Sequence, residues 1–362
     1  MAPLGEYHGS LCPEGLMDRI NVLVTGVGGN VGQGIIKALR LSKLNLQIIG
    51  ADASPFSPGL YRADKAYLVP RAGEKNYLSD MIRICKAESV HCVMLGPDQE
   101  LLTMAQNKEI IEKDTGAKVI ISSVAVVETS NDKWLTYLFL HEANLNYPSS
   151  FIPTSPEENL VQAETIGYPL IVKPRVGFGS KDIFVVQKKE ELNPIIRRVY
   201  NPIIQEYLMP DDEEYTSEVF TLADGSQLGT ITMKRRLLRG TSVVAICDDY
   251  PEIRDQAQKT AKALKPYGPC NFQMRLTRHG PVVFEINARF SGTTVARAKF
   301  GFNSPENALR HFVVGEKLNP PKIEKGVMLR YWEEIYLQEE HLKLLQKDKM
   351  IEGRIACKPD YF

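Results

Sequence analysis

The sequence predicts an α/β fold in which a doubly wound parallel sheet is followed by two α+β lobes. Short apolar strands alternate with helical segments from residue 20 to about 127, a pattern typical of a parallel sheet. After residue 130 the pattern changes to a small α+β block, and longer strands follow from about residue 209. A chain of 362 residues is too long for one small core, so several compact units are expected.

The N-terminal block begins with an apolar strand at 20–25 and a glycine-rich turn at 26–34. Residues 31–42 have the spacing of a helix, and the further strands are expected at 47–51, 90–95 and 118–121, with helical stretches between them. A ligand of such a sheet binds at the carboxyl ends of its strands.

The second block opens with Ser130-Asn131-Asp132, because these side chains cap helix N-termini, and its first helix is expected to run to about Ala143. The elements that follow are helix 156–166, strand 169–173, a loop at 174–182, strand 183–187, helix 189–199 and strand 202–207. The third block contains strands 214–222 and 227–234, helix 252–265 and a hairpin over 270–286.

The expected domain organisation follows from these blocks. It consists of a disordered leader at 1–18, an α/β domain at 19–127, a small lobe at 128–208, a large lobe at 209–325, and a C-terminal extension of one strand and one helix at 326–362.

The composition excludes several classes of protein. The 44 Lys and Arg residues balance the 44 Asp and Glu residues, which argues against nucleic acid or an anionic membrane as the main partner. No apolar run approaches the roughly 20 residues that span a bilayer. The six cysteines are scattered without a Cys-x-x-Cys pair, so they are expected to be reduced thiols in a cytoplasmic protein rather than zinc ligands.

A glycine fingerprint follows the first strand. Gly26, Gly29 and Gly32, with Asp52 at the end of the next strand, resemble a dinucleotide-binding turn, in which backbone amides approach a pyrophosphate. The alternative is a turn whose glycines only let a helix pack close to its strand. We favour the alternative, because a lone glycine fingerprint is weak evidence, and Tyr61 and Lys65 come too early for the acid-base pair of short-chain dehydrogenases.

Lysines and a glycine loop in the small lobe predict a phosphate site. Lys173 lies in the otherwise apolar strand 169–174, where an unpaired ammonium is costly to bury and calls for an anion. Gly177 and Gly179 follow in a loop that suits clamping of a polyphosphate. Lys133 lies in the first turn of its helix, where the helix dipole disfavours a cation unless a phosphate is bound.

The strand at 203–208 ends close to Met209-Pro210, a sequence that resembles a hinge between lobes. Backbone groups at Gln205 to Leu208 could pair with the edge of a purine, and Glu214 could accept from ribose hydroxyls. An ordinary edge strand followed by an acidic loop explains the same residues. The basic run at 234–236 could bind substrate or phosphate, although a solvated strand end is the simpler interpretation.

The hairpin near the end of the chain carries the strongest pattern. Glu285 and Asn287 are two residues apart on one strand, so their side chains share a face, and a turn about residue 279 places Gln273 opposite Glu285. Three oxygen-bearing side chains without sulfur or imidazole suit Mg²⁺. Arg289 continues the same face, where it could meet an anion beside the metal.

These residues, in this order, resemble the ATP-grasp superfamily, in particular the branch related to carbamoyl phosphate synthetase and the carboxylate-amine ligases. The resemblance covers roughly residues 20–325. Glu285-Ile-Asn287-Ala-Arg289 resembles the family's Glu-x-Asn-x-Arg motif, although Ala288 replaces the usual proline. It implies that the α/β domain is a pre-ATP-grasp domain and that the two lobes form the ATP-grasp fold.

The resemblance also implies roles for individual residues. ATP would be bound by Lys133, Lys173, Gly177, Gly179, Ser180, Gln205, Glu206, Tyr207, Leu208 and Glu214. Mg²⁺ or Mn²⁺ would be held by Gln273, Glu285 and Asn287. Arg289 and Lys173 would be catalytic, and Arg297, Ser291 and Gly292 are weaker candidates for contacts with the substrate.

The activity implied is that of an ATP-dependent carboxylate-amine ligase, which forms an acyl phosphate and releases ADP and phosphate. Two alternatives stay open: a kinase-like phosphotransferase on the same fold, and an NAD(P)-binding reductase or sensor that uses the glycine turn. The expected partners are a small-molecule carboxylate and an amine, with no nucleic acid and no membrane. A homodimer is an option that the sequence leaves open.

Overall fold

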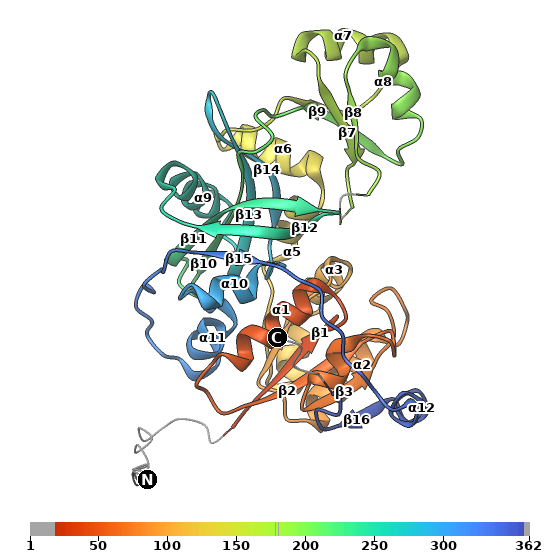
Figure 1. Ribbon diagram of the computed structural model, residues 1–362, viewed down its shortest axis with the longest axis vertical. Helices are drawn as coiled ribbons and strands as arrows, with labels where there is room; N and C mark the ends of the chain where they lie inside the picture. Colours follow the sequence, from red (N-terminus) through yellow and green to blue (C-terminus); the bar gives the residue numbers. More distant parts are fainter. Residues whose placement is uncertain (1–18, 178, 180, 358–362) are drawn as a thin grey trace, which may run out of the picture.

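The computed structural model of the chain describes residues 19–177, 179 and 181–357. Figure 1 shows three parts along the long axis of the molecule: the N-terminal domain at one end, the large lobe in the middle and the small lobe at the other end. Each part is built on its own sheet, two of six strands and one of four. In the described residues no helix is long and apolar enough to cross a membrane.

The N-terminal domain contains the predicted parallel sheet, with the strand order β16-β3-β2-β1-β4-β5. Its parallel strands are β1 (Ile20–Thr25), β2 (Leu46–Asp52), β3 (Lys65–Leu68), β4 (Cys92–Met94) and β5 (Lys118–Ile120). The helices between them are α1 (Asn30–Arg40), α2 (Tyr77–Ala87), α3 (Asp98–Gln106) and α4 (Lys108–Thr115), with a short 3₁₀ turn at Pro58–Arg62. The strand order reverses between β1 and β4, and this switch point is where ligands of such sheets bind.

The small lobe has an antiparallel sheet in the order β6-β9-β7-β8. Its strands are β6 (Ser150–Phe151), β7 (Leu170–Pro174), β8 (Phe184–Val186) and β9 (Pro202–Glu206), and its helices are α7 (Pro156–Ile166) and α8 (Lys189–Ile196). It has a separate apolar core, which includes Phe151, Val172 and Ile204.

The large lobe has a sheet in the order β14-β13-β10-β11-β12-β15. Its strands are β10 (Glu214–Thr221), β11 (Gln227–Leu238), β12 (Thr241–Cys247), β13 (Gly268–Thr277), β14 (Gly280–Asn287) and β15 (Gly326–Leu329). The helices of this part are α5 (Val124–Asn131), α6 (Lys133–Glu142), α9 (Pro251–Leu264), α10 (Thr294–Lys299) and α11 (Ser304–Ala308), followed by a π-helical turn at Leu309–Val314.

The strand β12 was not expected from the sequence. Arg239 and Gly240 both have positive φ angles, 49° and 75°, which is the backbone of a two-residue hairpin turn. The β-branched run that follows this turn pairs antiparallel with β11. The Arg-Gly pair before Thr-Ser-Val-Val was the local signal for this strand.

Two of the expected domain boundaries differ from the structure. The side chain of Leu140 in α6 lies in the same core as Phe272 and Ile286, so this helix packs with the large lobe instead of the small lobe. The described part of the C-terminal extension, 326–357, pairs with both neighbouring sheets: β15 joins the large-lobe sheet, and β16 (Met350–Glu352) pairs antiparallel with β3. Helix α12 (Glu339–Asp348) precedes β16, and the expected leader at 1–18 lies outside the described residues.

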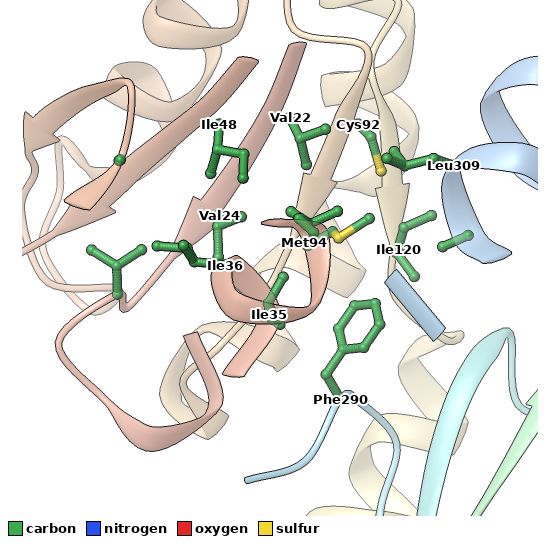
Figure 2. Packing of buried hydrophobic residues seen from close by; sticks show 14 of the residues in the cluster. Val22, Val24, Ile35, Ile36, Ile48, Cys92, Met94, Ile120, Phe290 and Leu309 are labelled. Carbon is green, nitrogen blue, oxygen red and sulfur yellow. The ribbon is translucent and has the colours of Figure 1, made fainter. Parts of the chain in front are cut away.

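The N-terminal domain and the large lobe share one apolar core. In Figure 2, Val24 and Met94 from the parallel sheet lie near Ile35 of α1; from the other domain, Phe290 lies next to Ile35 and Leu309 lies beside Cys92. Burial of each such side chain stabilises the chain by about 1.5–3 kcal/mol. The shared core therefore fixes the switch point of the parallel sheet against the end of β14.

The glycine turn after β1 is filled by protein. A Cβ on Gly26, which has a φ of 55°, would lie 2.2 Å from Pro97 Cγ, and one on Gly32 would lie 2.4 Å from the carbonyl oxygen of Gly26. Asp52 accepts a hydrogen bond from the backbone N–H of Gly28 at 2.7 Å. These contacts favour close packing, the second interpretation of the fingerprint, over a pyrophosphate site.

We expect Gly32→Ala to lower the free energy of unfolding by about 1–3 kcal/mol, because the added methyl group meets backbone atoms that cannot move aside. Gly34→Ala in the same helix is the matched control. Its nearest contact would be 3.7 Å from Ser291 O, so we expect it to be neutral or stabilising by up to about 1 kcal/mol. Urea unfolding followed by circular dichroism measures both, and equal stability of the two variants would contradict the packing role of Gly32.

Candidate active site

The candidate site is organised around Glu285 on β14. Gln273 on β13 is the register partner of Glu285, as the sequence predicted. Glu285 Oε1 accepts hydrogen bonds from Gln273 Nε2 and from Asn287 Nδ2, both at 3.1 Å. The hairpin turn is shorter than expected, at residues 278–279, and a bulge next to Gln273 restores the predicted pairing. The structure therefore brings all three proposed metal ligands together on one face.

The hydrogen bonds continue from Gln273 toward the small lobe. Arg235 Nη2 donates to Gln273 Oε1 at 2.5 Å and to Glu214 Oε1 at 2.8 Å. Arg275 Nη2 donates to the other oxygen, Glu214 Oε2, at 2.6 Å. Glu214, which the resemblance assigns to ribose, is therefore held between two arginines whose part in the site the sequence did not reveal.

On its other side the chain of hydrogen bonds reaches the N-terminal domain. Arg289 Nη2 donates to Asn287 Oδ1 at 3.0 Å. The same guanidinium forms a two-pronged ion pair with Asp98, at 2.7 Å from Nε to Oδ1 and 2.9 Å from Nη2 to Oδ2. We refer to this series, Asp98–Arg289–Asn287–Glu285–Gln273–Arg235–Glu214, as the polar chain.

Lys173 on β7 is a buried cation, with 5% of its surface exposed. Within the described part of the protein it makes no hydrogen bond or ion pair, and the nearest aromatic ring, that of Phe284, is 5.9 Å from its Nζ. Burial, together with the smaller effect of the neighbouring Lys133, lowers the pKa of Lys173 to about 7, against the opposing effect of Glu285 and Glu214. An anion at this position would supply the missing partner.

Lys133 begins helix α6 and is also buried. Its Nζ donates to the carbonyl oxygens of Arg175 at 3.4 Å and Gly177 at 3.2 Å. Burial lowers the pKa of Lys133, while Glu285 is the strongest of the charges that raise it. Lys133 and Lys173 therefore face the same carboxylate from two different lobes.

The glycine loop borders the space between these lysines. Gly177, Gly179 and Lys181 line a cavity together with Lys133, Lys173 and Glu285. Ser180, which the resemblance assigns to ATP, lies outside the described residues.

An adjoining cavity runs from Glu285 to the hinge between the lobes. Apolar walls from Ile171, Leu208, Leu237 and Phe284 enclose it. Polar residues from both lobes complete the lining, among them Gln205, Glu206, Tyr207, Glu214, Arg235 and Arg275. This cavity, which we call the slot, combines apolar walls with a few polar groups, the character of a small-molecule site.

The three weaker substrate candidates are engaged within the protein. Arg297 is fully buried and forms an ion pair with Glu218 at 2.5 Å and a hydrogen bond with Ser291 Oγ at 2.6 Å. A Cβ on Gly292 would lie 2.2 Å from Asn30 of the N-terminal domain. The structure therefore gives Arg297, Ser291 and Gly292 roles in packing rather than in substrate contact.

The arrangement fits a divalent cation with a polyphosphate. Glu285 Oε2 accepts no hydrogen bond from the described residues, and Asn287 Oδ1 has a second lone pair beside its bond to Arg289. Gln273 would present its oxygen to a cation once its amide turns, since Oε1 now accepts from Arg235. No group of three His, Cys, Asp or Glu side chains suited to a metal occurs in the described ranges, so a mixed carboxylate-amide set is the available one.

Comparison with known protein families agrees with this geometry. The model of the PylC-like N-terminal domain matches residues 22–120, and the model of the ATP-grasp domain matches residues 130–293. The chain therefore contains a domain of the ATP-grasp superfamily. ATP and Mg²⁺ are typical cofactors of this superfamily, and the lysines and the polar chain fit them.

Individual relatives are distant. The chain is 26% identical over 308 residues to the carbamoyl phosphate synthase large chain of Neisseria meningitidis. The aligned region covers 78% of this chain but only 28% of that protein. N5-carboxyaminoimidazole synthetase of Staphylococcus aureus, solved with ADP, has a TM-score of 0.69 at 16% identity. The superposition covers 91% of this chain and 85% of the synthetase chain.

A biotin carboxylase domain of Hydrogenobacter thermophilus, solved with MgADP, has a TM-score of 0.67 at 17% identity, covering 88% and 79% of the two chains. At this identity the solved structures show the shared ATP-grasp fold. They also share it over both lobes and the N-terminal domain, because most of this chain is covered.

The pKa of Lys173 leads to a pH dependence of nucleotide binding. A phosphate favours the protonated lysine, so binding raises the pKa, and the affinity for ADP should fall as the pH rises above 7. We expect a decrease of up to about tenfold per pH unit between about pH 7.5 and 9, where ADP itself no longer titrates.

Isothermal titration calorimetry in buffers of different ionisation enthalpy measures both this affinity and the proton taken up. Lys173→Arg is the matched control, because a guanidinium stays protonated throughout, and its ADP affinity should be flat over the same range. An equally flat profile for the unaltered protein would contradict the lowered pKa.

Proposed function

We propose that the protein is an ATP-dependent carboxylate-amine ligase that acts through an acyl phosphate. The observation that carries this proposal is the position of Lys173, a buried cation without a hydrogen-bond or ion-pair partner among the described residues, in one cavity with Glu285 and Gln273 of the facing hairpin. That combination suits the triphosphate and cation of Mg·ATP. It has no evident use in a protein that binds no anion, since burial of an unpaired ammonium is costly.

In this proposal the residues of the chain hold the reacting groups. Lys133 and Lys173 bind the phosphates, and Glu285, Asn287 and Gln273 hold Mg²⁺, which neutralises phosphate charge when it is bound. The slot between the lobes receives adenine, and Glu214 and its arginines lie where the ribose would be. Positioning and charge compensation are the main contributions that a protein makes to phosphoryl transfer.

The reaction then has two steps. A carboxylate oxygen of the substrate attacks the γ-phosphorus, the bond to ADP breaks, and an acyl phosphate forms. The amine attacks the carbonyl carbon, phosphate leaves, and the amine loses a proton. Arg289 lies beside Asn287 and is the residue suited to stabilise the acyl phosphate.

The names of the relatives support a ligase. Carbamoyl phosphate synthase and N5-carboxyaminoimidazole synthetase are both synthetases, and the second was solved with ADP. This chain spans 28% of the length of the first, so that protein's whole activity is not transferred here. Close packing accounts for the glycines of the turn, so they give the reductase no support of their own.

We expect Glu285→Ala and Lys173→Ala each to reduce ATP turnover at least about a hundredfold, because each removes a preorganised charge at the phosphates. The assay is phosphate release with carboxylates screened singly and in pairs with amines. Glu164→Ala, at an exposed ion pair on the small lobe, is the control and should retain full turnover.

The same assay separates a ligase from a phosphotransferase. A ligase requires the amine for steady phosphate release, whereas a phosphotransferase yields ADP and a stable phosphorylated product with the carboxylate alone. Full activity of Glu285→Ala would refute the site, and a stable phosphorylated product would refute the ligase.

A further inference from the structure

Asp98 joins the N-terminal domain to the candidate metal set. It is the first residue of α3 and follows Gly96 and Pro97 at the carboxyl end of β4, which is one side of the switch point. Pro97 packs over Gly26 on the other side. The carboxylate is thus held by a rigid part of the domain, next to the residues that end β14.

The contact between Asp98 and Arg289 is the strongest type of ion pair in proteins, because two parallel hydrogen bonds join the planar groups. Only 11% of the Arg289 side chain and 20% of the Asp98 side chain are exposed, so water screens the pair weakly. Asp98 also lines the cavity that contains Glu285, Asn287 and Lys133. The pair is therefore part of the site's wall and not a surface ion pair.

The donors of Arg289 are almost fully used. Two of its N–H groups bond to Asp98, one bonds to Asn287 Oδ1, and one bonds to the carbonyl oxygen of Phe290 at 2.8 Å. A guanidinium has five N–H groups, so a single one is left for a substrate oxygen. Its direction is fixed by the other four.

Charge compensation follows from the same geometry. Without Asp98, the positive charge of Arg289 would stand directly beside Asn287 and near Glu285, where a divalent cation is to be held. That charge would repel the cation and attract the Glu285 carboxylate away from it. It would also attract any phosphate more strongly.

We infer that Asp98 is a positioning residue of the site, which fixes Arg289 and neutralises it so that Glu285 and Asn287 remain available to a divalent cation. This role rests on the proposed function, because it presumes a metal–nucleotide complex at the polar chain. It makes the N-terminal domain a structural part of the metal site, although that domain supplies none of the proposed ligands.

The role predicts opposite changes in two affinities of Asp98→Asn. Mn²⁺ should bind roughly tenfold more weakly in the presence of saturating ADP, because an uncompensated arginine repels it. ADP without metal, measured in excess chelator, should bind as well as before or more tightly. A merely structural role would weaken both affinities, since a loosened site loses every ligand.

Electron paramagnetic resonance of free Mn²⁺ and calorimetry of ADP in chelator provide the two measurements on the full chain. Asp98→Glu keeps the charge and should bind Mn²⁺ within about threefold of the unaltered protein. Asp80→Asn, the same change at an exposed ion pair with Arg83 on α2, should alter neither affinity.

Parallel losses of both affinities in Asp98→Asn, an unchanged Mn²⁺ affinity, or equal losses in Asp98→Glu and Asp98→Asn would each overturn the inference. If the unaltered protein bound ADP with no dependence on Mn²⁺, the proposed function would fail, and this role of Asp98 with it. Normal Mn·ADP binding by the unaltered protein together with any of the first three results would remove the inference alone.

Discussion

The structure of the site depends on one acceptor, Glu285 Oε1, which accepts an amide N–H from Gln273 across the β13–β14 hairpin and another from Asn287 on its own strand. It fixes the directions of Gln273 and Asn287, and each of these amides in turn accepts from an arginine. Arg289 pairs with Asp98, and Arg235 pairs with Glu214, which it shares with Arg275. The arginines are thus neutralised locally, whereas Lys133 and Lys173 share Glu285. The excess positive charge of the site lies on the two lysines, which is where a polyphosphate needs it.

The site is supported by separate apolar cores. Phe290, next to Arg289, is buried in the core shared with the N-terminal domain, so the end of β14 is anchored to the switch point of the parallel sheet. The small lobe has its own core and brings Lys173 and the glycine loop. A lobe with an independent core can change its position without unpacking the rest. The cation-holding residues and Lys133 therefore belong to one packed unit, whereas Lys173 and the glycine loop belong to a lobe with its own core.

Which contacts of the site could be predicted depended on how far apart the interacting residues lie along the sequence. The three-residue set was predictable, because the alternation of a strand and the symmetry of a hairpin determine which side chains meet. Lys173 was conspicuous in an apolar strand. Asp98 was not predictable, because nothing local relates it to Arg289, 191 residues later. Arg235 lay in a basic run that a solvated strand end explained equally well, and its role appears only once Glu214 and Gln273 flank it. The pairing of β16 with β3 likewise joins segments far apart in the sequence, so local sequence patterns do not predict it.

The distribution of residues also separates the part of the site that is suited to ATP from the part that selects the other substrates. The slot and the lysines come from the two lobes, which the ATP-grasp family model spans. Beyond Glu285 and Asn287 the cavity is bounded by Asp98, Leu101 and Val127, and by Ser130 at the end of α5. These residues come from α3 and α5, at or next to the N-terminal domain. In the proposed function the acyl group lies beyond the γ-phosphate, where this wall and residues 285–288 of the hairpin line the same cavity. A relative that keeps the hairpin but has a different α3 would thus be expected to bind the same nucleotide and activate a different carboxylate.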